Sequence, residues 1–323
     1  MGSASIQTPV TISDIEAARA RIDGRVRRTP VLSATRLGAR VGVKLLLKAE
    51  HFQRAGSFKV RGALNKISCL TPQERARGVV AVSAGNHAQG VAWAAAELGV
   101  HAVIVMAATA SAAKIAATRG YGAEVILVEG GIGAAFAHVE EVRQARGLTL
   151  VHPFDDPLII AGQGSVGLEI VEDVPAVDTI VVGIGGGGLI SGIALAAKAR
   201  KPGVRVIGVE PAGGAVMRQS WDAGQPLEMT PVTIADGLAS PLAGTLTYAM
   251  TRALLDDIVT VTDEEIIAAL KDLLVYCKLY AEPAGAAPVA AILSGRLALA
   301  PDSTVVAVIS GGNFDLEALK KIL

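Results

Sequence analysis

The chain has 323 residues, which is enough for two domains of ordinary size. Its 30 basic and 30 acidic side chains balance, so the composition indicates no basic face and argues against nucleic acid as a partner. Apolar residues make up 51%, but no stretch reaches the roughly 18 uninterrupted apolar residues of a membrane span, so a large buried core is expected.

Two features bear on the cellular compartment. Cys69 and Cys277 lack the spacing of metal ligands, and we expect both to be reduced thiols. The first residues show no charged segment followed by an apolar one, so no secretory signal is expected. These patterns predict a cytoplasmic protein that does not act at a membrane.

Helical and strand-like patterns alternate along most of the chain. A first helix is expected from Ser13, with Glu16 completing a capping box. A strand at Leu45–Leu47 precedes a second helix, for which Ser57 is the expected N-cap.

The later strands are continuously apolar rather than alternating, which is typical of parallel strands covered on both faces. They are expected at residues 79–82, 102–106, 124–128, 179–184, 204–209, 259–262 and 304–309. Helices are expected between them at residues 88–98, 114–119, 136–146, 157–169, 189–199, 263–279 and 284–293, with a less regular section at 211–241. This order predicts an α/β fold with parallel sheets.

The stretch Gly56–Gly62 reads Gly-Ser-Phe-Lys-Val-Arg-Gly and places Lys59 in the first turn of the second helix. The partial positive charge of a helix N-terminus disfavours an ammonium group, and the apolar neighbours Phe58 and Val60 act in the same direction. Both effects lower the pKa of a lysine from about 10.4 and make its amine a better nucleophile. The alternative is a surface lysine that merely begins a helix.

Two polar loops follow predicted strands, at the positions where ligands bind in open parallel sheets. Ser83–His87 offers a hydroxyl, an amide side chain and helix-start N–H groups, which suit a small carboxylate. Ser310–Asn313 follows the last strand, and its hydroxyl could meet a heterocyclic nitrogen. Taken alone, each loop is also compatible with an ordinary turn, and His87 with a structural histidine.

A third loop, Gly183–Gly188, lies between a strand and a helix and contains four consecutive glycines. Its backbone N–H groups could surround one phosphate ester. The loop also fits the Gly-x-Gly-x-x-Gly pattern of dinucleotide-binding folds, and Glu210 follows at about the spacing of their ribose-binding acid. A nicotinamide-dependent dehydrogenase is therefore an alternative, although it leaves Lys59 without a role.

Taken together, the motifs resemble those of the pyridoxal-phosphate-dependent serine/threonine dehydratases (threonine ammonia-lyases), which have the tryptophan-synthase β fold (fold type II) and are related to serine racemase. The motifs are Gly56–Ala63, Ser83–Gly90, Ile160–Gly164, Gly185–Leu189, Ala235–Gly237 and Ser310–Asn313. The resemblance implies an α/β protein with two open parallel-sheet domains. Residues 1–70 with 153–323 would form a large domain that anchors pyridoxal 5'-phosphate, and residues 71–152 a small substrate-binding domain.

The resemblance also implies a role for each motif. Lys59 would bind the cofactor covalently and move the substrate's α-proton. Phe58 would flank the cofactor ring, Asn86 would bond its 3-oxygen, and Ser310 would meet its nitrogen. The cofactor's phosphate would be held by Gly185, Gly186, Gly187, Gly188 and Leu189. The substrate would lie against Ser83, which is also a catalytic candidate, and against Ala84, Gly85, Asn86 and His87.

The implied reaction is β-elimination, in which a β-hydroxy amino acid such as threonine or serine gives a 2-oxo acid and ammonia. The family further implies a cytoplasmic homodimer. Serine racemase is the nearest alternative within the fold. In the racemases that the chain resembles, a serine supplies the acid opposite the lysine, and Ala84 occupies that position here. The sequence therefore favours elimination.

Two departures from the family pattern concern the ligands. Glu210 matches an acidic residue that binds a divalent cation in some relatives, but Val216 stands where a second carboxylate is expected. Glu210 is therefore the candidate ligand for a divalent or monovalent cation. The small residues at 107–113 and 130–135 are expected to leave room for a bulky substrate such as phenylserine. Ala135, where an arginine could pair a second carboxylate, argues against hydroxyaspartate.

Overall fold

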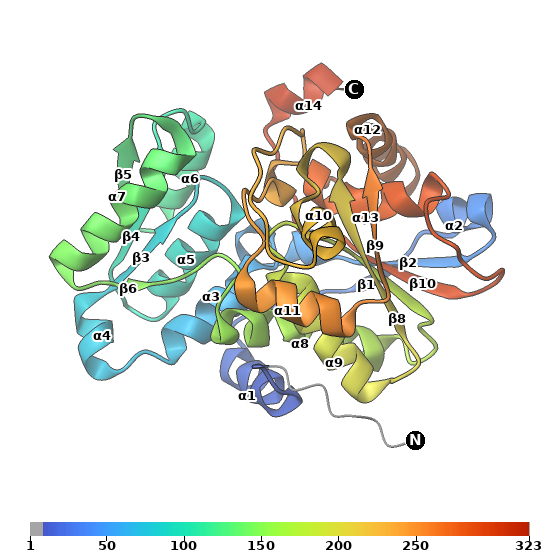
Figure 1. Cartoon of the computed structure of the whole chain (residues 1–323), viewed down its shortest axis with the longest axis horizontal. Coiled ribbons are helices and arrows are strands. Elements are labelled where there is room, and N and C mark those ends of the chain that lie inside the picture. The colour runs from blue at the N-terminus through green and yellow to red at the C-terminus, as the bar shows by residue number, and fades with distance from the viewer. Residues whose placement is uncertain (1–8, 323) are drawn as a thin grey trace.

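The computed structural model describes residues 9–322 and contains two sheets that lie side by side (Figure 1). The larger sheet has the strand order β1-β2-β10-β7-β8-β9. Its strands are β1 (Val31–Ser33), β2 (Lys44–Lys48), β7 (Thr179–Gly183), β8 (Arg205–Pro211), β9 (Asp257–Val261) and β10 (Thr304–Val308). All neighbouring pairs are parallel except β1 with β2 at one edge, so the larger sheet is not wholly parallel.

Helices cover both faces of the larger sheet, which explains its continuously apolar strands. Val182 on β7 packs in one core with helices α1 (Ile12–Ile22), α8 (Pro157–Asp173), α9 (Gly188–Arg200) and α11 (Thr245–Leu254). Its neighbour Val181 packs in the opposite core with α2 (Thr35–Val41), α12 (Asp263–Asp272) and α13 (Pro283–Leu293). Successive residues of one strand are thus buried on opposite faces.

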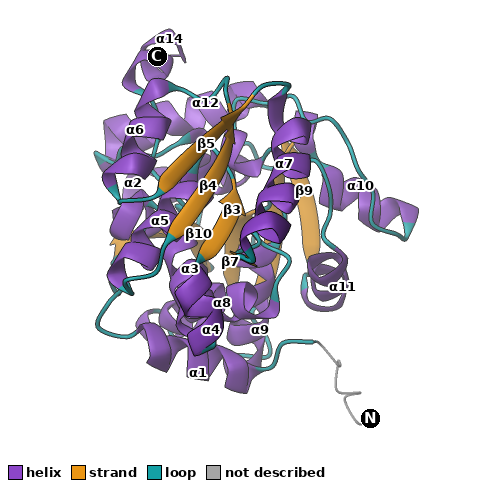
Figure 2. Ribbon diagram, turned by 90° about the vertical axis from the view of Figure 1, so that its left-hand side faces the viewer, coloured by secondary structure: helices purple, strands orange, loops and turns teal. Residues whose placement is uncertain are grey.

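The smaller sheet is parallel and has the order β5-β4-β3-β6. Its strands are β3 (Val79–Val82), β4 (Ala102–Ala107), β5 (Glu124–Val128) and β6 (Thr149–Leu150). Helix α7 (Gly131–Arg146) lies on one face, while α5 (Asn86–Glu97) and α6 (Ala112–Gly120) lie on the other (Figure 2). Helix α3 (Lys59–Ser68) packs between α5 and α8 and so joins the two sheets. The predicted α/β fold with two parallel-sheet units is confirmed.

Most predicted elements are present, but several boundaries were wrong. The first helix begins at Ile12, and its capping box is formed by Thr11 and Asp14, not by Ser13 and Glu16. The helix expected to reach Leu279 ends at Asp272 and is followed by a π turn at Leu273–Cys277. Four helices were not predicted: α2, α10 (Val216–Ala223) in the section expected to be irregular, α11, and α14 (Leu316–Ile322). Short α4 (Pro72–Arg77) follows α3.

Within residues 9–322, no helix combines the length and the apolar character that crossing a bilayer requires.

Candidate active site

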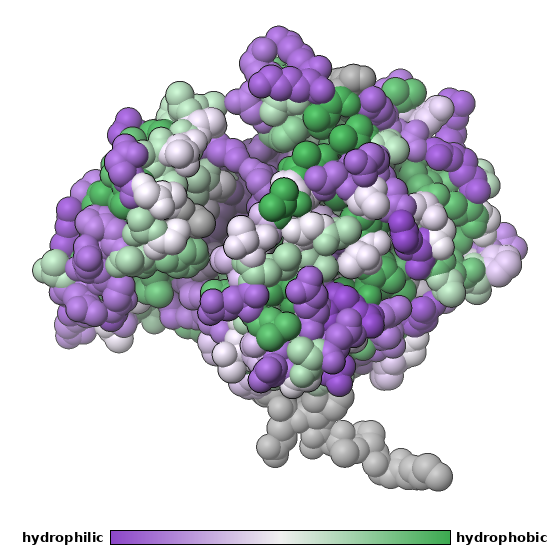
Figure 3. All heavy atoms as spheres, turned by 45° about the horizontal axis from the view of Figure 1, so that its top comes forward, coloured by the Kyte–Doolittle hydropathy of each residue, from purple (hydrophilic) through white to green (hydrophobic). Residues whose placement is uncertain are grey.

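A cavity of about 510 Å³ lies between the two sheets and has the size of a small-molecule site. The molecular surface is hollowed between the part that carries the smaller sheet and the rest of the molecule (Figure 3). The cavity is lined by the loops that follow β2, β3, β7 and β10, as the parallel-sheet argument predicts. Segments far apart in the sequence therefore meet at one place.

Lys59 is the first residue of α3 and lines the cavity. Its Nζ donates a hydrogen bond to the Pro153 carbonyl oxygen at 2.8 Å and lies 5.2 Å from the centre of the Phe58 ring. Burial lowers the pKa of Lys59 to about 8, although the charge of Glu282 acts in the opposite direction. The predicted N-cap was wrong: the Ser57 hydroxyl has no hydrogen-bond partner, and α3 has no side-chain cap within the described chain.

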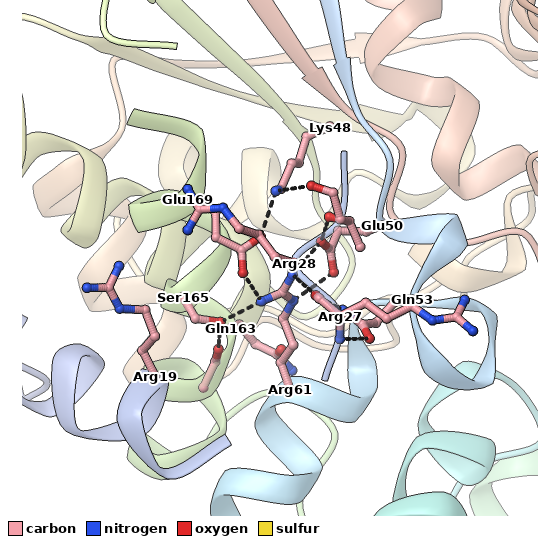
Figure 4. A network of polar contacts seen from close by, with 12 residues as sticks. Arg19, Arg27, Arg28, Lys48, Glu50, Gln53, Arg61, Gln163, Ser165 and Glu169 are labelled. Carbon is pink, nitrogen blue, oxygen red and sulfur yellow. Dashed lines mark hydrogen bonds and ion pairs between the residues drawn. The ribbon is translucent and has the colours of Figure 1, made fainter. Parts of the chain in front are cut away.

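Arg61, two residues after Lys59, anchors the other side of α3 in a buried ion network (Figure 4). Its guanidinium donates to Glu50 at 2.8 Å and to Glu169 at 2.7 Å. Lys48 Nζ donates to the second oxygen of Glu169 at 2.6 Å and to the Thr29 carbonyl oxygen at 2.7 Å. Two buried cations thus face two buried carboxylates, and the balance of charge makes their burial tolerable.

The glycine loop connects β7 to α9. Gly187 has φ of +89°, which favours glycine, and a Cβ on Gly186 would come within 2.1 Å of the Phe154 ring. Helix α9 has no side-chain cap in the described chain, and residues Gly185–Gly188 and Leu189 line the cavity. The N–H groups at this helix start are therefore free to hold an anion of phosphate size.

The loop Ser83–His87 lines the same cavity and leads into α5. Helix α5 begins at Asn86 and also has no side-chain cap among the described residues. The Ser83 hydroxyl oxygen accepts from the Gly85 N–H at 3.1 Å, so its own hydrogen is free to donate. A second anion-binding helix start thus faces the cavity, with a hydroxyl beside it.

His87 lines the cavity but makes a structural contact. Its Nε2 lies 2.8 Å from the Val151 carbonyl oxygen, which can only accept, so Nε2 carries the proton. Burial lowers the pKa of His87 to about 3, with the charge of Lys59 adding to the effect. The neutral ring is therefore fixed against the backbone, and its role toward a substrate remains a prediction.

Ser310 follows β10, is 5% exposed and lines the cavity, as predicted. Its carbonyl oxygen accepts from the Phe58 N–H at 3.1 Å, so the last strand holds the residue before Lys59. The predicted residues from the loops after β2, β3, β7 and β10 are thus brought together. Glu210 is absent from the described lining of this cavity.

Three charged residues of the cavity had no predicted role. Glu282 accepts from Asn86 Nδ2 at 2.6 Å, and burial, followed by the charge of Asp236, raises its pKa to about 8. Lys114 on α6 forms an ion pair of 2.5 Å with Asp236, which joins the two sides of the cavity. Asp236 lies in a family motif, but nothing in the local sequence distinguishes Glu282 from a residue that begins a helix.

The prediction that small residues at 107–113 and 130–135 line the substrate site was wrong for Ala135. Ala135 is fully buried in the core between α7 and the smaller sheet, so it does not line the cavity. Phe136 and Lys114, which directly follow the two small-residue stretches, line it instead. The wall therefore presents an aromatic ring and an ammonium group.

Glu210 contacts the start of α10. One carboxylate oxygen accepts from Met217 N–H at 2.9 Å and the other from Arg218 N–H at 2.8 Å. Val216 beside them is fully buried. Within residues 9–322, no group of three His, Cys, Asp or Glu side chains is arranged to hold a metal ion. The geometry gives Glu210 the role of a helix cap, and metal binding by it remains a prediction.

Glu210→Ala is expected to lower the free energy of unfolding by about 1–2 kcal/mol, the usual cost of losing a helix cap. Urea denaturation of the variant and the wild type, each with and without EDTA, measures this. Under the capping role, EDTA leaves the wild type unchanged. If EDTA destabilises the wild type as much as the substitution does, Glu210 holds a cation.

Comparison with known proteins gives consistent matches. A family model described as pyridoxal-phosphate dependent enzyme matches residues 22–311. The chain is similar to the catabolic L-threonine dehydratase of Staphylococcus aureus (strain USA300), with 44% identity over 318 residues, 97% of this chain and 92% of the relative. It is equally similar to that of Escherichia coli (strain K12), with 44% identity over 316 residues, 97% of this chain and 96% of the relative.

A solved structure, that of maize serine racemase, superposes on the chain with a TM-score of 0.93. The two are 42% identical, and the match covers 97% of this chain and 96% of that one.

Proposed function

Because the chain belongs to the family of pyridoxal-phosphate-dependent enzymes, we propose that it is an ammonia-lyase that converts a β-hydroxy amino acid to a 2-oxo acid and ammonia. The observation that carries this proposal is the half-buried Lys59 amine, which shares a cavity with two uncapped helix starts. One helix start suits a phosphate and the other a carboxylate.

The cavity fits the cofactor residue by residue. Lys59 would hold it covalently, beside Phe58, and the N–H groups of Gly185–Leu189 would bind its phosphate. Asn86 would donate to the ring oxygen, and Ser310 would meet the ring nitrogen. When bound, the cofactor supplies the electron sink for the pair left on the substrate's α-carbon.

Each step on the substrate has a candidate group in the chain. The N–H groups at the start of α5, with the Ser83 hydroxyl, would hold the substrate carboxylate and fix the α-carbon. Lys59 would then take the α-proton, because a pKa of about 8 leaves part of its amine neutral near neutral pH. In the net reaction, the α-proton and the β-hydroxyl leave as one water, and the resulting enamine takes up one water to give the 2-oxo acid and ammonia.

Threonine or serine is the proposed substrate, since the relatives from both bacteria are L-threonine dehydratases. A bulkier analogue such as phenylserine is a further candidate, because the Phe136 ring lines the cavity.

We also propose a cytoplasmic homodimer. The large domain would comprise residues 1–70 with 153–323, of which 1–8 lie outside the described chain, and the small domain residues 71–152.

Absorbance and product assays test the proposal. The purified protein is expected to bind pyridoxal phosphate with a visible band that borohydride abolishes. A panel of threonine, serine, phenylserine and hydroxyaspartate should then yield a 2-oxo acid and ammonia from at least one of the first three. Absence of both products from the cofactor-loaded protein would overturn the proposal that the protein is an ammonia-lyase. A nicotinamide-dependent oxidation of the substrates would favour the dehydrogenase instead.

Serine racemase is the second candidate, because the maize enzyme is structurally similar along almost the whole chain. Racemisation requires an acid on the face of the α-carbon opposite Lys59. Ala84 lines the cavity at the position where we expect that acid, and its methyl group has no proton to give. Protons are therefore expected to leave and return on one face only.

L-Serine incubated in deuterium oxide is accordingly expected to give pyruvate with almost no D-serine. Ala84→Ser should introduce measurable D-serine, because it places a hydroxyl on the second face. Chiral chromatography of the amino acids measures both. Abundant D-serine from the unmodified protein would put the racemase first.

A further inference from the structure

A chain of side-chain amides runs from the Lys59 loop into the cavity. It begins at the carbonyl oxygen of Ala55, which accepts from Asn313 Nδ2 at 2.7 Å. A carbonyl can only accept, so this contact fixes which end of the Asn313 amide is the nitrogen. The approach depends on Gly56, because a Cβ there would lie 2.4 Å from Asn313 Oδ1.

The same Asn313 nitrogen also contacts Asn86. Its second hydrogen reaches Asn86 Oδ1 at 2.8 Å, so the Asn86 atom that faces Asn313 must be the oxygen. Asn86 Nδ2 therefore points the other way, where it donates to Glu282 Oε1 at 2.6 Å. The Ala55 carbonyl thus fixes the orientation of the Asn313 amide, and the Asn313 amide in turn fixes the orientation of the Asn86 amide.

The second N–H of Asn86 has no partner among the described residues, and Asn86 lines the cavity. An amide nitrogen carries two hydrogens, and Glu282 takes one of them. The other is available to a ligand. With the amide turned over, the oxygen lone pairs of Asn86 would face that ligand instead.

We propose that Asn313 and Glu282 are positioning residues that hold the Asn86 amide with its free N–H toward the cofactor's ring oxygen. This rests on the proposed function, because the ligand is pyridoxal phosphate. Neither residue needs to touch the substrate for this role. Both act through Asn86, so substituting either residue should no longer change the affinity for the cofactor once the Asn86 amide is removed.

A double-mutant cycle with cofactor affinity as the readout tests this directly. Asn313→Asp keeps the shape but cannot donate to Asn86 or Ala55. In the otherwise unmodified protein it should weaken binding of pyridoxal phosphate to the apo form about tenfold, as expected for one hydrogen bond to a charged oxygen. In the Asn86→Ala background the same change should weaken binding less than about twofold. Equal weakening in both backgrounds would overturn the proposal.

Glu282 gives an independent arm that does not depend on how Asn313→Asp folds. Glu282→Gln keeps an oxygen that can accept from Asn86 and should leave the cofactor affinity within about threefold. Glu282→Leu removes the acceptor and should weaken binding about tenfold, but only while Asn86 is present. Equal loss from the Gln and Leu variants, or a loss from Leu that persists with Asn86→Ala, would contradict the inference.

Two controls separate the causes of failure. The thermal unfolding of each apo variant shows whether the fold survives, and the position of the visible band shows whether the ring environment changes. A wild type that binds no pyridoxal phosphate would overturn the proposed function and this inference with it. A wild type that binds the cofactor but shows additive effects would overturn only the inference.

Discussion

Lys59→Ala is expected to lower turnover by about 10³-fold or more, because it removes both the covalent attachment of the cofactor and the base at the α-carbon. Lys59 stands at the start of α3 in the cavity, with a pKa of about 8 through burial. Turnover is measured as 2-oxo acid release at saturating cofactor. Peptide mapping after borohydride reduction should place the label on the peptide that contains Lys59.

Lys66 provides a matched control on the same helix. Its Nζ forms an ion pair of 2.7 Å with Asp156, and Lys66 does not appear in the described lining of the cavity. Lys66→Ala should therefore keep turnover within a few-fold of the wild type, since neither Lys66 nor Asp156 belongs to the described lining of the cavity. A borohydride label on Lys66, or on any lysine other than Lys59, would refute the assignment.

The start of the Lys59 helix shows what local sequence can and cannot predict. A strand, a glycine and an amphipathic run sufficed to place Lys59 in the first turn of α3. Ser57 was nevertheless wrong as the cap, because it forms an isolated bridge with Gly311, and Phe58 N–H donates to Ser310. Contacts with the last strand decide the conformation here, and residue spacing along one segment carries no information about them.

The cavity wall shows a second limit. Small residues in the first turns of α7 predicted an open wall, but a helix turns by about 100° per residue, so adjacent residues face different directions. Ala135 consequently packs against the smaller sheet, whereas Phe136 reaches the cavity. Glu282 was missed for another reason: its partner Asn86 lies 196 residues away. Only the folded chain brings these two side chains together.

Arg61→Ala is expected to lower the free energy of unfolding by about 3–5 kcal/mol, the usual cost of removing one partner of a buried ion pair. Arg61 and Glu50 are fully buried, and Glu169 is nearly so. Without the guanidinium, Glu50 and Glu169 both lose an ion-pair partner, while Glu169 keeps its ion pair with Lys48 and Glu50 its hydrogen bond from the Thr29 hydroxyl. The Arg61 charge also lowers the pKa of Glu50, against the burial that raises it.

Urea denaturation, followed by far-UV circular dichroism, measures this loss as a shift of the midpoint at constant slope. Arg200→Ala is the matched control, because Arg200 pairs with Glu16 at the surface, where both side chains are at least 40% exposed. That change should cost less than about 1 kcal/mol, as exposed pairs do. The comparison separates the loss of a buried charge partner from the general effect of shortening an arginine.

The charge balance of the network predicts a specific rescue. If an unpaired carboxylate causes the loss, Arg61→Met with Glu50→Gln should recover much of it, because Glu169 keeps its ion pair with Lys48 and a neutral amide costs less to bury than an unpaired charge. Such a variant would still lack the contacts that hold α3 against α8, so the geometry of Lys59 should stay impaired and turnover should remain low. Arg61→Ala with an unchanged urea midpoint, or a double variant no more stable than Arg61→Ala alone, would show that the network does not stabilise the fold in this way.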